Sequence, residues 1–292
     1  MGGTVTGVAP ARDDTLLLLD SASLYFRAYF GVPDSVRAPD GTPVNAVRGF
    51  LDAITTLVGA RRPGRLVACW DEDWRPAFRV AAIPSYKAHR VVEGPADEEA
   101  VPDDLSPQVP IIAEVLAALG IARAGAAGFE ADDVIGTLVA REAARAPDAR
   151  AGSIEVVTGD RDLFQLVDDS AGVRVLYTGK GVRNLLVIDQ AALRERYGVE
   201  HGRAYADAAV LRGDPSDGLP GVRGIGEKTA AALIGRFGSL AGLLRALDSD
   251  DPELAPQQRR RLLEAADYLA VAPRVVDVVL DAPVPELDDS LP

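Results

Sequence analysis

Three short apolar runs in this sequence are each followed at once by an aspartate, and this pattern constrains the fold more than any other feature. The pairs are Leu16–Leu19 with Asp20, Leu66–Trp70 with Asp71, and Ile154–Gly159 with Asp160. Runs this apolar are typical of strands that are buried on both faces of a parallel sheet. Because the carboxyl ends of parallel strands lie along one edge of the sheet, we expect the three aspartates to lie together there.

Strand-like and helix-like segments alternate along the N-terminal two thirds of the chain. The strands predicted from β-branched or leucine-rich runs are Thr15–Leu19, Arg65–Trp70, Ile154–Thr158 and Val173–Tyr177. The helices predicted from amphipathic runs are Val44–Gly59, Pro107–Gly120, Ala131–Arg145 and Asp189–Tyr197. We expect Gly120 to end the second helix and Asp189 to cap the fourth. The alternation predicts an α/β domain with a mostly parallel central sheet.

The composition changes along the chain and predicts its division into regions. We predict a disordered tail over residues 1–14, an α/β core over 15–200, a helical domain over 201–280 and an acidic, frayed tail over 281–292. The segment Val91–Pro110 holds four prolines and six acidic residues, which indicates an irregular or mobile stretch within the core. Beyond His201 the strand pattern stops, and helical patterns continue to about Ala266.

Composition also excludes several classes of protein. One cysteine and two histidines cannot supply a disulfide framework or a Cys/His zinc site. The apolar runs are too short to span a bilayer, and the first 14 residues lack the features of a signal peptide, so we expect a cytoplasmic protein without a membrane partner. The net charge of −13 argues against a nucleic-acid partner, unless cations neutralise the acidic motifs.

Further acidic residues join the same predicted edge of the sheet. Asp162 follows Asp160 by two positions, and Glu130, Asp132 and Asp133 open the helix that precedes the third run. Each acid alone is equally typical of a turn, a helix cap or a favourable contact with a helix dipole. Seven carboxylates on one edge, however, repel one another unless cations lie among them. Mg²⁺ or Mn²⁺ suits such oxygen ligands, and two ions about 4 Å apart suit the hydrolysis of a phosphodiester.

A glycine-rich turn lies in the predicted helical domain. Gly221, Gly224 and Gly226 come just before Lys228 and an alanine-rich helix. Glycines allow close approach of a phosphate, and a helix N-terminus favours an anion, so the stretch predicts a helix-hairpin-helix that binds the DNA backbone. The alternative is a plain packing corner between two helices. Asp214 and Asp217, just upstream, are close enough in sequence to reach the carboxylate edge.

A second basic element follows Asp71. It contains Arg75, Arg79, Tyr86, Lys87 and Arg90. Arg79, Lys87 and Arg90 are candidates to contact a scissile phosphate, and Tyr86 is a candidate to stack on a base. A solvated helix face would show the same spacing.

Together these motifs resemble the 5′ nuclease family, above all the bacterial 5′–3′ exonuclease found at the N-terminus of DNA polymerase I and as stand-alone flap endonucleases. The motifs, in family order, are LLLLDSASLYFRAYF, VACWDEDWRPAFR with IPSYKAHR, GFEADDVIGTL, VVTGDRDLFQLV and LRGDPSDGLPGVRGIGEKTA. The resemblance runs from about Leu16 to Val279. It implies a nuclease core with a helical arch over residues 75–108, followed by a helix-hairpin-helix domain.

The resemblance also implies roles for individual residues. The implied ligands of one metal site are Asp20, Asp71, Glu130, Asp132 and Asp133, and those of a second are Asp160, Asp162, Asp214 and Asp217. The implied catalytic residues that steer the scissile phosphate are Arg27, Lys87 and Arg90. The candidate DNA contacts are Arg79, Tyr86, Gly221, Val222, Gly224, Gly226, Lys228 and Thr229. Backbone carbonyls of the hairpin are implied to hold a K⁺.

The resulting hypothesis is a monomeric, Mg²⁺- or Mn²⁺-dependent nuclease that removes 5′ flaps and RNA-primed or damaged 5′ ends in replication and repair. Its partners would be DNA with flaps, nicks or 5′ ends, and a DNA polymerase acting in trans. Two departures from the family pattern are Gly218 in place of an asparagine and an acidic, proline-rich arch over Glu93–Pro107. The alternatives are a DNA-binding scaffold with a degenerate metal site and an RNA-cleaving, toxin-like relative, which would lack the glycine-rich turn.

Overall fold

The computed structural model describes residues 13–92, 99–146 and 149–291. Within them, six strands form one sheet in the order β3-β2-β1-β4-β5-β6. The strands are β1 (Asp13–Asp20), β2 (Pro63–Cys69), β3 (Ala122–Ala124), β4 (Ser153–Thr158), β5 (Val173–Tyr177) and β6 (Leu186–Ile188). Only β6 is antiparallel to its neighbour, so the predicted α/β fold with a mostly parallel sheet is confirmed. Most of the predicted tail over residues 1–14 lies outside the described residues.

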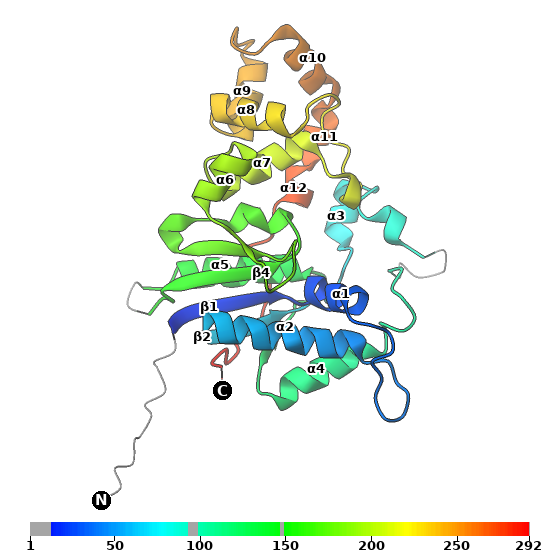
Figure 1. Cartoon of the computed structure of the whole chain (residues 1–292). Coiled ribbons are helices and arrows are strands. Elements are labelled where there is room, and N and C mark those ends of the chain that lie inside the picture. Colours follow the sequence, from blue (N-terminus) through cyan, green and yellow to red (C-terminus); the bar gives the residue numbers. More distant parts are fainter. Residues whose placement is uncertain (1–12, 93–98, 147–148, 292) are drawn as a thin grey trace, which may run out of the picture.

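Helices cover both faces of the sheet (Figure 1). On one face lie α1 (Ser21–Gly31), α2 (Asn45–Arg61) and α4 (Gln108–Ala118), and on the other lies α5 (Ala131–Ala143). The leucine run of β1 explains this arrangement, because successive side chains of a strand point to opposite faces. Leu17 and Leu19 belong to the core beneath α2, whereas Leu16 and Leu18 belong to the core beneath α5.

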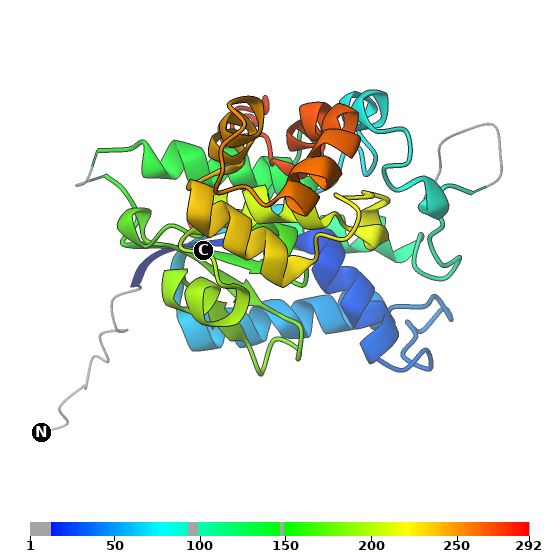
Figure 2. The ribbon, with the colours of Figure 1, turned by 90° about the horizontal axis from the view of Figure 1, so that it is seen from above.

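A second group of helices covers the α5 side of the sheet and extends away from it (Figures 1 and 2). These helices are α6 (Gln190–Tyr197), α7 (Gly202–Arg212), α8 (Glu227–Phe237), α9 (Leu240–Asp248), α10 (Pro256–Glu264), α11 (Ala266–Val271) and α12 (Pro273–Val276). Their buried side chains and those beneath α5 form one continuous hydrophobic cluster. The two parts of the chain therefore share a core.

The acidic C-terminal segment is not frayed, which corrects the sequence-based expectation. The chain returns to the sheet after α12, and Ser290 pairs with Arg65 at the edge of β2. Both carboxylate oxygens of Asp289 accept hydrogen bonds from Arg65, at 2.9 and 2.7 Å. Ala282 and Val284 are buried. Asp289, one of the acidic residues that suggest a solvated tail, is therefore a specific partner of Arg65 in the sheet.

Among the described residues, no single helix is both long and apolar enough to cross a membrane. The α8–α9 pair meets the length and composition criteria when taken together, with a bend of 76° at the junction.

Candidate active site

The carboxyl ends of three adjacent strands bring the predicted aspartates together. The sheet order places β2, β1 and β4 side by side, and they lead into Asp71, Asp20 and Asp160 respectively. The backbone around them is held by short hydrogen bonds. Asp20 caps α1 by accepting a hydrogen bond from the Ser23 backbone N–H at 3.1 Å, and it accepts another from the Thr158 hydroxyl at 2.6 Å. These contacts fix the carboxylate of Asp20 at the edge of the sheet.

A hydrogen bond fixes the carboxylate of Asp71 in a similar way, and another holds the backbone at Asp160. Asp71 accepts a hydrogen bond from the backbone N–H of Ala131 at 2.8 Å, which ties the start of α5 to the end of β2. The backbone N–H of Asp160 donates to the Thr158 hydroxyl at 2.8 Å. Thr158 thus links the carboxylate of Asp20 to the loop that carries Asp160.

These acids line a cleft of about 620 Å³. The predicted metal ligands that line it are Asp20, Asp71, Glu130, Asp132, Asp160 and Asp214, and the predicted catalytic residues that line it are Lys87 and Arg90. Sequence reasoning missed further lining residues, namely Ser23, Glu72, Trp74 and Glu99. In residues 13–92, 99–146 and 149–291, no three acidic, histidine or cysteine side chains are already arranged as a metal-binding group.

Burial raises the pKa values of several of these carboxyl groups. It raises the pKa of Asp20 to about 6 and that of Asp71 to about 7. Burial and then the charge of Asp160 raise the pKa of Asp132 and of Asp162 well above the ordinary range. The charges of Asp217 and Asp214 also raise the pKa of Asp162, so the acids of the second predicted metal site repel one another. The cleft is therefore short of positive charge.

The donor set of the cleft fits a hard divalent cation such as Mg²⁺ or Mn²⁺. Carboxylate oxygens are the ligands that these ions prefer, and repulsion among the acids is what a bound cation relieves. Six carboxylates of the cleft or of the acids at its edge form no ion pair with an arginine or lysine among the described residues, and these fit a cation best. They are Asp20, Asp71, Asp132, Asp160, Asp162 and Asp214.

The raised pKa values of Asp20 and Asp71 predict how pH affects metal-free protein. In the folded protein the pKa values of these two carboxyl groups, about 6 and about 7, lie above the ordinary 3.8. At a pH between the ordinary value and the folded-state values, the folded protein therefore binds more protons than the unfolded chain. Their contribution to stability is therefore present at low pH and is lost as the pH rises through about 7. We expect the increase in Tm produced by Ca²⁺, relative to EDTA, to grow as the pH rises over this range. If Ca²⁺ increased Tm by the same amount at low pH and at pH values above about 7, Asp20 and Asp71 would not be the residues that bind the cation.

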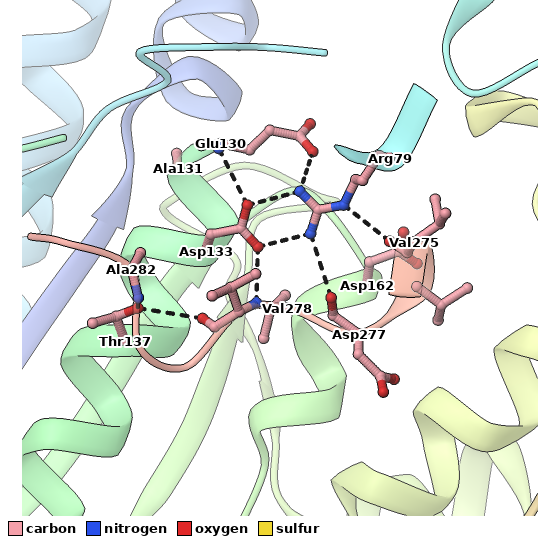
Figure 3. A network of polar contacts seen from close by, with 12 residues as sticks. Arg79, Glu130, Ala131, Asp133, Thr137, Asp162, Val275, Asp277, Val278 and Ala282 are labelled. Atoms are coloured by element: carbon pink, nitrogen blue, oxygen red, sulfur yellow. Dashed lines mark hydrogen bonds and ion pairs between the residues drawn. The ribbon is translucent and has the colours of Figure 1, made fainter. Parts of the chain in front are cut away.

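One predicted metal ligand, Asp133, is occupied elsewhere (Figure 3). It is fully buried, and its two carboxylate oxygens accept hydrogen bonds from Arg79 at 2.7 Å each. One of these oxygens also accepts from the Val279 backbone N–H at 2.8 Å. Asp133 also forms a reciprocal capping box with Glu130 at the start of α5. Asp133 is therefore not a metal ligand, because its lone pairs are already used.

Arg79 is correspondingly not a surface contact for DNA, which corrects another sequence-based expectation. Only 2% of its surface is exposed, and it lies in α3 (Ala77–Ala82). Figure 3 shows its guanidinium between α5 and the segment after α12. It donates to Glu130 at 2.7 Å and to the Val275 carbonyl at 3.1 Å. Arg79 thus joins the base of the predicted arch to α5 and to the C-terminal segment.

Tyr86 is also buried and does not present its ring for base stacking. Its hydroxyl donates to Glu130 at 2.7 Å. The ammonium of Lys87 pairs with the other oxygen of Glu130. Burial alone would lower the pKa of Lys87, but Glu130 raises it well above the ordinary value, so Lys87 remains charged. Glu130 is therefore best described as the partner that positions Lys87 at the cleft.

Arg90 and the turn over Asp214–Gly218 contact each other. Arg90 donates to Asp217 at 2.9 Å and to the Ser216 carbonyl at 3.1 Å. Gly218 has a φ of +73°, and a Cβ there would lie 2.1 Å from the Ser85 carbonyl oxygen. An asparagine would not fit, which explains the glycine at this position. The base of the predicted arch thus rests on this turn; residues 93–98 of the arch lie outside the described residues.

Arg27 lies beside the cleft rather than in it. It is exposed on α1 and lines a hollow of about 510 Å³ with Phe26 and Phe30, which adjoins the cleft through Phe26. Gly159, next to Asp160, lines the same hollow. Arg27 therefore borders the loop that carries Asp160.

The glycine-rich turn forms the predicted connection between α7 and α8. Gly221, Gly224, Gly226, Lys228 and Thr229 are exposed or partly exposed there. Val222, in contrast, is buried, and its backbone N–H donates to the Leu211 carbonyl at 2.8 Å. Val222 is therefore wrong as a DNA contact: it anchors the turn in the core.

Comparison with known proteins agrees with this architecture. Residues 15–198 match the family described as "5'-3' exonuclease, N-terminal resolvase-like domain", and residues 201–291 match "5'-3' exonuclease, C-terminal SAM fold". A 5'-3' exonuclease of Streptomyces coelicolor is 64% identical over 280 residues, which cover 94% of this chain and 90% of that protein. DNA polymerase I of Mycobacterium bovis is 39% identical over 290 residues, which cover 98% of this chain and 30% of the polymerase.

A solved structure shares the fold. The bacteriophage T5 D15 flap endonuclease, described in complex with DNA and metal ions, superimposes with a TM-score of 0.70 at 17% identity, covering 90% of this chain and 89% of that one.

The chain belongs to the 5′-3′ exonuclease family. It is accordingly a nuclease, that is, a hydrolase, and the resemblance to this family is confirmed. It is homologous both to separate 5′-3′ exonucleases and to a part of DNA polymerase I.

Proposed function

We propose that this protein is a divalent-metal-dependent nuclease that cleaves 5′ flaps as well as 5′ ends, and that it serves primer removal and repair. The observation that carries the proposal is the cleft in which carboxylates from three strand ends face Lys87 and Arg90. A cluster of oxygen ligands beside two cations is suited to a phosphodiester, because the cations can bind the phosphate while the acids hold metal ions.

The residues that would hold the metal ions fall into two neighbouring sets. Asp20, Asp71 and Asp132 line one part of the cleft, and Asp160, Asp162 and Asp214 are the candidates for the other, whereas Asp217 pairs with Arg90. Bound Mg²⁺ or Mn²⁺ would lower the pKa of a water and stabilise the leaving oxygen. The Thr158 hydroxyl donates to the carboxylate of Asp20 and accepts from the backbone N–H of Asp160, while the carboxylate of Asp160 accepts from the Asp162 backbone N–H, so both acids are held in place before a substrate arrives.

Lys87 and Arg90 would orient the scissile phosphate. Both line the cleft, and each is held by a carboxylate, Glu130 for Lys87 and Asp217 for Arg90. These pairs limit the conformations of two long side chains, which reduces the entropy lost when they contact a phosphate. Arg27, at the border of the cleft, would contact the neighbouring part of the strand.

The proposed partners and location follow from the same features. We propose DNA with 5′ flaps, nicks or 5′ ends as the substrate, a polymerase acting in trans, a monomeric protein and a cytoplasmic location. A buried lone cysteine is compatible with a reducing compartment.

The experiment that tests the proposal is cleavage of labelled flap, nicked and single-stranded DNA with Mg²⁺, with Mn²⁺ and with EDTA. We expect cleavage close to the junction of the flap with either metal and none with EDTA. Binding of flap DNA without cleavage under both metals would favour a scaffold with a degenerate site instead.

Lys87 and Lys228 are expected to affect different steps. Lys87→Ala should lower the single-turnover rate at saturating enzyme by about 10²-fold, because a contact to the developing charge is lost. Lys228→Ala should weaken binding by about 1–2 kcal/mol, the scale of one charged hydrogen bond, with little change in the saturated rate. Fluorescence anisotropy with Ca²⁺ in place of Mg²⁺ measures the affinity. The reverse pattern, a loss of affinity alone for Lys87→Ala, would contradict the assigned roles.

A further inference from the structure

Arg261, which lies outside the glycine-rich turn in sequence, lies against it in the fold. It belongs to α10, and its guanidinium donates to the Gly224 carbonyl at 2.8 Å. A Cβ at Gly224 would lie 2.8 Å from the central carbon of this guanidinium and 3.0 Å from both terminal nitrogens. The guanidinium therefore lies close against the glycine, and no larger residue at position 224 would leave it in place.

Arg261 is the last of three consecutive arginines that differ in their partners. Arg259 pairs with Asp250 at 2.9 Å and donates to the carbonyls of Leu247 and Asp251, so it holds the α9–α10 connection. Arg260 is exposed and pairs with Glu264 at 3.7 Å. Among the described residues, Arg261 has no carboxylate partner. Its charge is therefore uncompensated at the turn.

The surroundings of the turn increase this local positive charge. Glu227, the acid closest in sequence, is paired with Arg161 at 2.9 Å and with Arg212 at 3.6 Å. Arg223 and Lys228 are exposed, and in the part of the chain that the structure describes neither has an acidic partner. A surface of three uncompensated cations around exposed glycines suits a phosphate of the DNA backbone.

The same geometry does not fit the K⁺ that the family resemblance implies at this hairpin. The Gly224 carbonyl oxygen accepts from a cationic guanidinium, and those of Val222 and Gly226 accept from Ile225 and Ala230 backbone N–H groups. A K⁺ beside Gly224 would lie against a second positive charge and be repelled.

We propose that the guanidinium of Arg261 is a built-in cation of the hairpin, which binds the DNA backbone and takes the role that the resemblance assigns to K⁺. The inference rests on the proposed function only in that the hairpin binds duplex DNA. An arginine has five N–H donors, so one bond to Gly224 leaves others for a phosphate.

The test compares Arg261→Ala with Arg260→Ala by anisotropy on nicked duplex DNA in Ca²⁺, where no cleavage is needed. Arg261→Ala should weaken binding by about tenfold, as for loss of a charged hydrogen bond. It should also reduce the slope of log affinity against log salt by about 1. Arg260→Ala should change neither, because Arg260 does not touch the turn. Arg261→Lys should keep the salt slope, since the charge remains.

The monovalent cation provides an independent measurement. We expect the wild-type affinity to be the same in KCl and NaCl at equal ionic strength, because the hairpin carries its own cation. Loss of affinity when Na⁺ replaces K⁺ would overturn the proposal, and so would an Arg261→Ala variant that binds like Arg260→Ala. If Arg261→Ala lowers Tm, Arg259→Ala serves as the structural control, since it should lower Tm without changing the salt slope. A failed cleavage assay would count against the proposed function and would leave these binding results standing.

Discussion

Asp160→Ala is expected to abolish cleavage while DNA binding persists or becomes tighter. Asp160 lies at the end of β4, lines the cleft and raises the pKa of both Asp132 and Asp162. Its charge thus acts on acids of both proposed metal sets. Its removal takes away a proposed ligand, and also a negative charge that repels phosphate. A loss of at least about 10³-fold in the single-turnover rate is expected for a transition-state contribution of 4 kcal/mol or more.

The measurement combines single-turnover cleavage of a flap substrate in Mg²⁺ with anisotropy in Ca²⁺. Asp52→Ala is a suitable control, because Asp52 is exposed on α2 and pairs with Arg48 away from the cleft. The control should retain both the rate and the affinity of the wild-type protein. Near-normal turnover of Asp160→Ala would exclude Asp160 from the reaction.

The edge of acids was predictable because it depends on local sequence and on one topological rule. Each strand ends where its apolar run ends, and parallel strands place those ends together. The prediction that Asp20, Asp71 and Asp160 lie together therefore required no knowledge of tertiary contacts. The four predicted strands are also observed, because their apolar runs are long enough to show a pattern. Strands β3 and β6 have three residues each and carry no such pattern.

The partners of individual side chains were not predictable in the same way. Asp133 looks like a metal ligand in the sequence, but Arg79, 54 positions away, takes both its oxygens. Asp289 looks like part of a solvated tail, but it pairs with Arg65, 224 positions away. Such pairings depend on which elements meet in the fold. The residues next to Asp133 and Asp289 in the sequence do not indicate these pairings.

The glycine-rich turn shows the same limit within one motif. The sequence indicates that its backbone approaches a phosphate, yet it does not say which N–H groups are already used. The fold buries Val222 and Ile225 as anchors and leaves the glycines exposed. It also adds Arg261, which no pattern around Gly224 contains. Helical spacing could have indicated that Arg261 lies at the surface, but not that it contacts Gly224.

The second large effect is expected for Arg79, through stability rather than through chemistry. Arg79 is buried between Glu130 and Asp133, and it also donates to the Val275 carbonyl. Arg79→Met would leave the carboxylate of Asp133 buried without its cation, while Glu130 would keep Lys87 as a partner. Breaking such a buried pair costs about 3–5 kcal/mol in the free energy of unfolding. At the entropy of unfolding typical of a chain of this length, that loss corresponds to a decrease in Tm of about 5–8 °C.

Two comparisons separate this explanation from simple loss of packing. Adding Asp133→Leu should recover part of the loss, since a buried charge is then replaced by an apolar side chain. Arg48→Ala, which breaks an exposed pair with Asp52, should change the free energy of unfolding by less than about 1 kcal/mol. A loss for Arg79→Met that is not relieved by Asp133→Leu would show that Arg79 acts through packing, and the ion-pair explanation would be wrong.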